Sequence, residues 1–172
     1  MAGRGWRVAG GKKKRTTKSK SRSSSPTRHP PPANRWAGGW YVVPWQVIFR
    51  DIDTFGHVNN AVYLTYFELA RAALWFELTG GSLPTDIGFI VVRAEIDFRQ
   101  QLGMEPIDIC VRIGDIRNTS FDTHYEIRTS NGRQIAATGK VVVVLFDWKT
   151  NSKTRVTDEL RNKVRLFQKE AE

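Results

Sequence analysis

The sequence predicts an α+β domain in which one long central helix is wrapped by a curved, mainly antiparallel β-sheet. Apolar side chains occupy every side of the helix expected over residues 58–79, whereas a surface helix carries a single apolar stripe. The β-type runs that follow exceed the usual five or six residues, and long twisted strands can curl around a helix. The element order β–α–β–β–β–β–α is typical of the α+β class.

Each element has its own local signal. A first strand is expected over residues 41–50, where apolar positions alternate. Asn59 and Asn60 are the candidate caps of the central helix, and Gly80-Gly81 ends it. The later strands are expected over residues 87–98, 107–117, 121–129 and 134–148, with Asn131-Gly132 as a hairpin turn, and a last helix runs from Thr157 to Phe167. No glycine-rich phosphate loop follows a strand, so a nucleotide-binding fold has no support.

Basic charge is concentrated at the start of the chain. Residues 1–40 hold eleven of the 27 Lys and Arg residues and none of the 17 acids, so the rest is close to neutral. We predict a disordered basic tail over 1–40 and one domain over 41–172. The tail is a solvated arm or a mis-assigned start, an organelle transit peptide, or a weak contact for nucleic acid or anionic membrane.

The single cysteine, Cys110, lies in an apolar run and is expected to be a buried small hydrophobe. One cysteine forms no disulfide within the chain, which fits a reducing compartment. We therefore expect a cytoplasmic protein, or an organellar one if the tail is a transit peptide. No run reaches the roughly 18 apolar residues that cross a bilayer.

Residues 49–71 concentrate the polar chemistry. Two carboxylates, Asp51 and Asp53, precede a glycine turn with His57, and the helix then begins through Asn59 and Asn60. Acid, histidine, amides and a helix N-terminus thus fall within about ten residues. Such a junction can orient a water molecule and polarise a carbonyl group.

This D-x-D-x-x-G-H-V-N-N run, Asp51 to Asn60, resembles the hotdog-fold acyl-CoA thioesterases, and more narrowly the 4-hydroxybenzoyl-CoA thioesterase group with the GHVNN variant. The likeness continues through residues 94–98, 119–121 and 136–139 and covers about 44–167. It implies a hotdog fold, hydrolysis of an acyl-CoA or acyl-carrier-protein thioester without a cofactor, and a homodimer or homotetramer. It also implies that Asp53 is the catalytic carboxylate and that a backbone N–H near Asn60 polarises the thioester oxygen.

The candidate catalytic residues each have a structural alternative. Asp53 acts as a base or a nucleophile, or it caps the turn; Asp51 is expected to be structural and to face outward. His57 orients Asp53 or the attacking water, or it braces the turn through a backbone carbonyl. Asn59 and Asn60 are helix caps by default, although the Asn59 side chain could also bind water or the acyl carbonyl.

Predicted substrate contacts are Phe49, Gly56, Tyr63, Glu68 and Ser120. Glu68 and Arg71 are spaced for an ion pair along the helix, and the alternative makes Glu68 a catalytic acid that serves a neighbouring subunit. No His or Cys cluster accompanies the two aspartates, so no metal site is expected. The candidate cations for the CoA phosphates are Arg93, Arg99, Arg112, Arg117 and Lys140.

Two functions of other classes compete with catalysis. One is a non-catalytic hotdog protein that binds acyl groups, and the intact Asp53 argues against it. The other is a nucleic-acid-associated protein in which the basic tail dominates, with binding that is sensitive to salt.

Overall fold

One antiparallel sheet and two helices make up the part of the chain that the computed structural model describes, residues 33–129 and 134–169. These residues belong to the second of two units of the chain, residues 31–172. The strands are β1 (Arg35–Ala37), β2 (Trp40–Gln46), β3 (Phe89–Phe98), β4 (Pro106–Ile116), β5 (Ser120–Thr129), β6 (Ile135–Asp147) and β7 (Ser152–Lys153). The helices are α1 (Asn60–Thr79) and α2 (Asp158–Lys169), with short 3-10 turns η1 (Phe49–Asp51) and η2 (Pro84–Asp86).

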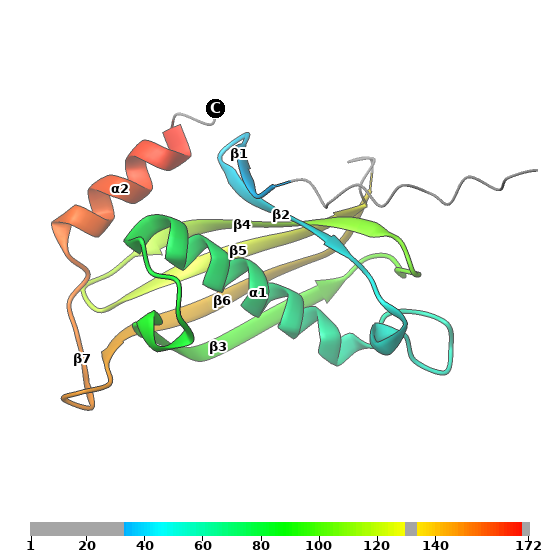
Figure 1. The fold of residues 1–172 in the computed structure, drawn as a ribbon, viewed down its shortest axis with the longest axis horizontal. Coiled ribbons are helices and arrows are strands. Elements are labelled where there is room, and N and C mark those ends of the chain that lie inside the picture. The colour runs from blue at the N-terminus through cyan, green and yellow to red at the C-terminus, as the bar shows by residue number, and fades with distance from the viewer. Residues whose placement is uncertain (1–32, 130–133, 170–172) are drawn as a thin grey trace, which may run out of the picture. The chain divides into compact units, whose positions relative to one another are not determined.

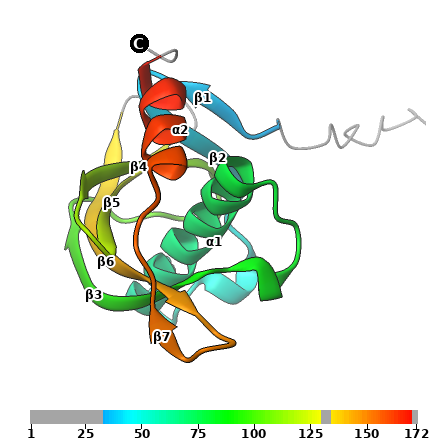
Figure 2. The ribbon, with the colours of Figure 1, turned by 90° about the vertical axis from the view of Figure 1, so that its left-hand side faces the viewer.

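The strand order in the sheet is β1-β2-β4-β5-β6-β3, with every pair antiparallel, and β7 adds a short pairing to β6. Helix α1 lies along one face of this sheet (Figure 1), and the sheet curves around it (Figure 2). The long strand β3 forms one edge. The predicted α+β class, central helix and C-terminal helix are confirmed.

Close packing between α1 and the sheet centres on Phe67, which is fully buried. Its ring stacks on the Tyr125 ring of β5, with centroids 4.2 Å apart and planes 15° from parallel. It also lies directly against Gly139 of β6, where a side chain would occupy the same space. The absence of a side chain at Gly139 therefore sets how near α1 can approach the sheet.

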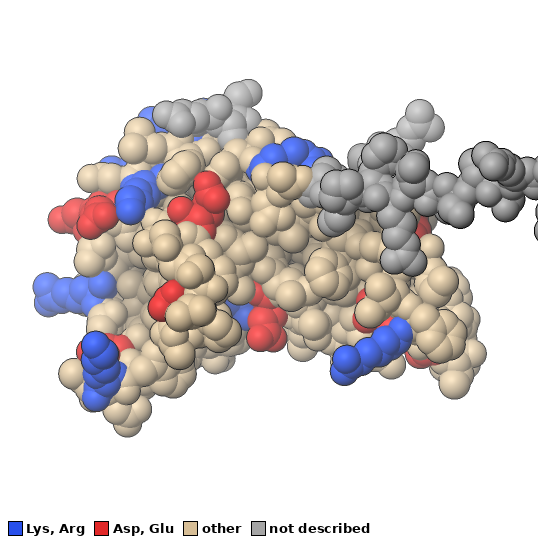
Figure 3. Space-filling model, viewed as in Figure 1, with Lys and Arg blue, Asp and Glu red and all other residues tan. Residues whose placement is uncertain are grey.

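Helix α1 is not covered on all sides, which corrects the expectation from its composition. Its exposed positions include Ala61, Leu64, Thr65 and Glu68, and Leu64 is 46% exposed. Figure 3 shows acidic and basic side chains scattered among uncharged residues on the face of the body that carries α1. The side of α1 that the sheet does not reach thus carries both apolar and polar side chains, and this chain alone leaves it open to solvent.

The first elements differ from the expected ones. The ordered body begins before residue 41, because Trp36 of β1 packs edge-on against Tyr41 and stacks on Phe167 of α2 at 5.5 Å. The strand expected to reach residue 50 ends at Gln46, since the Asp51 carboxylate accepts the Ile48 N–H and closes the η1 turn. The Asn131-Gly132 turn and the tail up to residue 32 lie outside the described residues.

The ion pair predicted between Glu68 and Arg71 is absent from the described residues. Arg71 is only 8% exposed and donates from Nη1 to the Tyr125 hydroxyl at 3.1 Å, while its guanidinium lies 5.6 Å from the Phe89 ring centroid. Thr123 gives its proton to the Val141 carbonyl, so the Tyr125 hydroxyl donates to Thr123 Oγ1. Arg71 Nη1 thus joins a buried hydrogen-bond chain rather than a carboxylate, and Arg71 Nε is buried with no hydrogen-bond partner among the described residues.

We predict that Gly139→Ala destabilises the protein by about 1–3 kcal/mol, because overpacking a filled core forces its neighbours to move. A Cβ at this position would clash with Phe67 Cε2 and lie 2.9 Å from the Glu95 carbonyl oxygen. Chemical denaturation measures the change. Gly103→Ala is the matched control, since a Cβ there meets nothing within 4 Å, and equal stability of the two variants would contradict the packing argument.

Candidate active site

A tight turn between Asp53 and His57 leads into helix α1. The Asp53 N–H donates to the His57 carbonyl at 2.9 Å, and the Gly56 N–H donates to the Asp53 carbonyl at 3.0 Å. Gly56 has a φ of +82°, a conformation that glycine adopts without strain. Asp53 Oδ1 accepts the Phe55 N–H at 2.8 Å, so the carboxylate is fixed by its own turn.

The start of α1 is anchored on both sides. Asn59 is the N-cap, and its Oδ1 accepts the Ala61 N–H at 2.9 Å, as expected for a capping asparagine. Its own N–H donates to the Asp51 carbonyl, and the Val58 N–H donates to the Leu102 carbonyl. The helix N-terminus is thus held between the preceding turn and the loop that follows β3.

Asp51 has the predicted structural role, but it does not face outward. Its Oδ2 accepts the hydroxyl of buried Tyr66 at 2.8 Å and the Ile48 N–H at 3.2 Å. Burial raises the pKa of Tyr66, and the hydrogen bond to Asp51 raises it further. The first carboxylate of the pair therefore ties the turn to α1.

A cavity of about 510 Å³ lies at this helix N-terminus and brings the four predicted catalytic residues together. Tyr63, one turn into α1, supplies a wall and packs edge-on against Phe98 with centroids 5.0 Å apart. Tyr63 is 3% exposed, and burial, followed by the charge of Glu105, raises its pKa. The lining residues are Asp53, Phe55, His57, Val58, Asn59, Asn60, Tyr63, Phe98, Arg99, Gln100 and Gln101.

Two polar groups of the backbone turn and helix start matter most in this cavity, and neither has a partner within the described part of the chain. One is the backbone N–H of Asn60, the first residue of α1, which precedes the helical hydrogen bonds. The other is Asp53 Oδ2, since only Oδ1 accepts a hydrogen bond. An N–H donor at a helix N-terminus favours an oxyanion, and a free carboxylate oxygen can accept a proton or attack a carbonyl carbon.

His57 lines the same cavity, and neither of its predicted hydrogen bonds is present. Across residues 33–129 and 134–169, no bond joins its imidazole to Asp53 or to a backbone carbonyl. The ring is half-buried and faces the space where a substrate would lie.

Of the five predicted substrate contacts, only Tyr63 lines the cavity. Gly56 shapes the turn behind it, and Phe49 of η1 is 82% exposed outside it. Glu68 lies further along α1 on its exposed side. Ser120 pairs with Val144, at the end of the sheet opposite Phe98, which pairs with Ala137. Strand register, which local patterns do not reveal, separates Ser120 from this cavity.

Sequence reasoning missed the far wall of the cavity, which consists of Phe98, Arg99, Gln100 and Gln101 from the end of β3. Phe98 is the last residue of the 94–98 segment that resembles the family, and this resemblance was the one sequence signal that could have pointed to the wall. The contact joins segments some forty residues apart, so only the folded chain brings them together.

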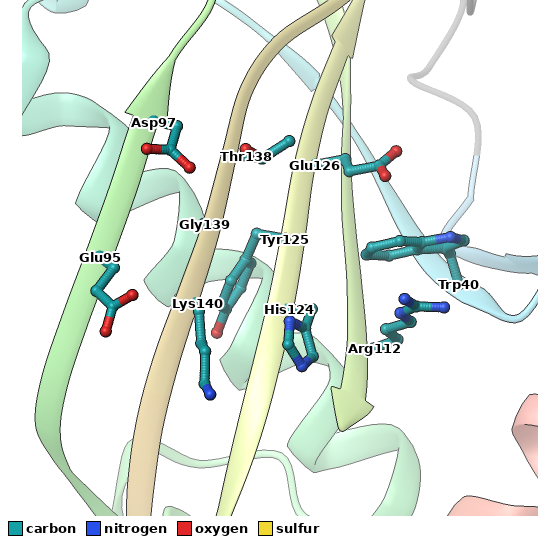
Figure 4. Close-up of a pocket in the computed structure, with 10 residues that line it drawn as sticks. All are labelled: Trp40, Glu95, Asp97, Arg112, His124, Tyr125, Glu126, Thr138, Gly139 and Lys140. Atoms are coloured by element: carbon teal, nitrogen blue, oxygen red, sulfur yellow. The ribbon is translucent and has the colours of Figure 1, made fainter. Parts of the chain in front are cut away.

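A second hollow, of about 280 Å³, lies on the opposite face of the sheet. Figure 4 shows Glu95, Lys140, His124 and Arg112 there, from the adjacent strands β3, β6, β5 and β4. Its cations are already engaged: Lys140 pairs with Asp122 at 2.7 Å, and Arg112 lies 4.5 Å from the Trp40 ring centroid. None of the predicted catalytic residues reaches it.

Other observations concern metals, membranes and the cysteine. Within the described ranges, no three or more His, Cys, Asp or Glu side chains gather in a way that could hold a metal ion. No described helix is both long and apolar enough to cross a membrane. Cys110 is fully buried, as predicted, and burial raises its pKa to about 11.

The fold and cavity define a hotdog-fold protein, and known proteins agree. The chain is similar to the structure of a predicted thioesterase from Bacillus stearothermophilus, with 25% identity and a TM-score of 0.68 over 74% of this chain and 96% of that one. It is also similar to a thioesterase complexed with coenzyme A and Zn from Thermus thermophilus, with 26% identity and a TM-score of 0.66 over 77% of this chain and 96% of that one.

A further relative is the uncharacterized protein YsmA of Bacillus subtilis (strain 168), 29% identical over 66% of this chain and 77% of that protein. Residues 47–164 match the Thioesterase-like superfamily, and this chain belongs to that family.

Proposed function

We propose that this protein hydrolyses acyl-CoA thioesters to a free carboxylic acid and CoA at the N-terminus of α1. The observation that carries the proposal is the pairing, in one cavity, of a free Asn60 N–H with a turn-anchored Asp53 carboxylate. These are the two groups that a thioester carbonyl requires, a donor for its oxygen and a base or nucleophile for its carbon.

The reaction divides between these two groups. The thioester oxygen accepts the Asn60 N–H, and the helix N-terminus stabilises the negative charge that develops there. With Asp53 as base, water loses a proton to the carboxylate and attacks the carbonyl carbon, the C–S bond breaks, and the thiolate takes up the proton. With Asp53 as nucleophile, the carboxylate attacks the carbonyl carbon, the C–S bond breaks and the CoA thiolate leaves. Water then hydrolyses the resulting anhydride to the free acid and the Asp53 carboxylate, and the proton that water releases is taken up by the thiolate. His57 lies beside this space and is suited to orienting the water.

Coenzyme A is the favoured leaving group because the similar Thermus thermophilus thioesterase is complexed with it. An acyl-carrier-protein thioester presents the same reacting bond and stays the alternative substrate. A binding protein without catalysis would need no free carboxylate oxygen beside the donor. The rival based on nucleic acid rests on residues 1–40, most of which lie outside the described residues. A cytoplasmic location stays a prediction.

We also propose that two copies associate through β3. This ten-residue edge strand is exposed from Val91 to Glu95, and an uncovered strand edge is a template for pairing with another strand. Val91 and Val92 are 47% and 55% exposed, and Phe98, at the end of the strand, is both 49% exposed and a cavity wall. A partner strand would lie beside the cavity.

Such a dimer keeps one earlier alternative open. Glu68 on the exposed side of α1 is available to a neighbouring subunit, as its second predicted role requires. A tetramer built from two such dimers is a further assembly that the family resemblance allows.

We expect Asp53→Asn to lower kcat by about 100- to 10,000-fold, the usual contribution of a positioned base. Asparagine retains the oxygen that accepts the Phe55 N–H, so the turn and the melting temperature should persist. Thiol release from aromatic, short-chain and long-chain acyl-CoAs and acyl-carrier-protein thioesters measures the change. Asp97→Asn, an exposed acid outside this cavity, is the control, and unchanged turnover in Asp53→Asn would refute the mechanism.

Asn60→Pro removes the N–H without removing the helix. Proline is favoured at the first helical position, and Asn59 already has the extended conformation (ψ 137°) that proline requires of the preceding residue. We expect kcat to fall by about 100- to 1,000-fold, as when an oxyanion donor is lost. Asn60→Ala keeps the N–H and should retain most activity. Equal activity of the two variants would exclude the backbone donor.

For the dimer, we expect sedimentation analysis of the parent protein to give a mass twice that of the 19.6 kDa chain. The double variant Val91→Lys/Val92→Lys should sediment as a monomer, because charges on an edge strand oppose pairing. Leu166→Lys, which places a charge at a 59% exposed position on α2, should remain dimeric. A monomeric parent, or a double variant of unchanged mass, would contradict assembly through β3.

A further inference from the structure

We infer that Arg99 binds a phosphate group of coenzyme A at the mouth of the cavity and thereby selects CoA thioesters. This assignment rests on the proposed function. CoA carries a 3′-phosphate and a diphosphate, and a site for it needs a cation near the reacting groups that no carboxylate neutralises.

The position of Arg99 is fixed by the end of β3. Its N–H donates to the Ala136 carbonyl at 2.9 Å, and its Nε donates to Thr138 Oγ1 at 3.2 Å. Arg99 is exposed and is among the residues that line the cavity of Asp53 and Asn60, while its partner Thr138 lines the hollow on the opposite face of the sheet. The guanidinium is therefore oriented through Nε, and both Nη groups stay available to a ligand.

Its charge is also available. No ion pair to Arg99 occurs among the described side chains, whereas the other four candidate cations are engaged. Arg93 pairs with Glu95, and Arg112 lies over Trp40. Arg117 and Lys140 both bind Asp122, and the hydrogen bond from Arg117 is the main reason that the Asp122 pKa falls to about 2. Of the five candidates, only Arg99 combines a free charge with a place in the cavity.

The chemistry favours phosphate over a neutral ligand. A guanidinium has donors in a planar fork that matches two phosphate oxygens, and with Nε bound to Thr138 that fork is presented in one direction. Arg99 is a positioning residue under this assignment, because it contacts the CoA portion and not the thioester bond. It should affect KM and leave kcat unchanged.

The test compares each acyl group on CoA with the same acyl group on N-acetylcysteamine, which carries the thioester without phosphate. We expect Arg99→Gln to raise KM for the CoA thioester about tenfold, the loss of one charge-assisted contact, and to leave KM for the N-acetylcysteamine thioester unchanged. Arg165→Gln removes the same charge from an exposed position on α2 and should leave the KM for both substrates unchanged. An equal rise in KM for both substrates, or no rise, would overturn the assignment.

Calorimetric titration with CoA itself separates this inference from the proposed function, since binding does not require hydrolysis. Weaker CoA binding by Arg99→Gln, with unchanged binding of pantetheine, supports the phosphate contact even if no thioester is hydrolysed. If the variant binds CoA and 3′-dephospho-CoA with equal affinity while the parent protein does not, Arg99 contacts the 3′-phosphate. If the variant binds both ligands more weakly but keeps the parent's difference in affinity between them, Arg99 contacts the diphosphate. Unchanged CoA affinity would refute the inference.

Discussion

The contact between Phe67 of α1 and Gly139 of β6 sets the position of the helix and, with it, the geometry of the site. It lets the helix lie directly on the sheet, with Phe67 stacked on Tyr125. Because a helix is nearly rigid, this one close approach also positions its N-terminus against the end of β3. The cavity between Asn60 and Phe98 is a consequence of where the middle of the helix is held.

The site combines rigidity with incomplete hydrogen bonding. The turn at Asp53 is closed by its own backbone, and Asn59 caps the helix, so the backbone around the site is held in place. The Asn60 N–H and one oxygen of Asp53 have no partner within the described part of the chain. Groups held in place but left unpaired can stabilise a developing charge without reorganising, which is how an enzyme lowers the energy of a transition state.

The same domain leaves two surfaces open, the edge of β3 and the outer side of α1. Both follow from wrapping a helix with a sheet that covers only part of its circumference. Because Phe98 belongs to the edge strand and to the cavity, the proposed association along β3 would be physically connected to the proposed catalysis. The inferred role of Arg99, the next residue, would extend that connection to the CoA portion of the substrate.

Local sequence signals were enough to place most of the elements and to pick out the residues that meet in the candidate site. Helix composition, the Asn59 cap and the D-x-D turn are such signals, so α1, the later strands and the roles of Asp51 and Cys110 could be predicted. Tertiary packing set the rest. The Arg71 partner, the place of Ser120 and the Phe98–Gln101 wall depend on which strands become neighbours and in what register. Contacts between distant segments arise from packing, and the spacing of residues along the chain does not predict them.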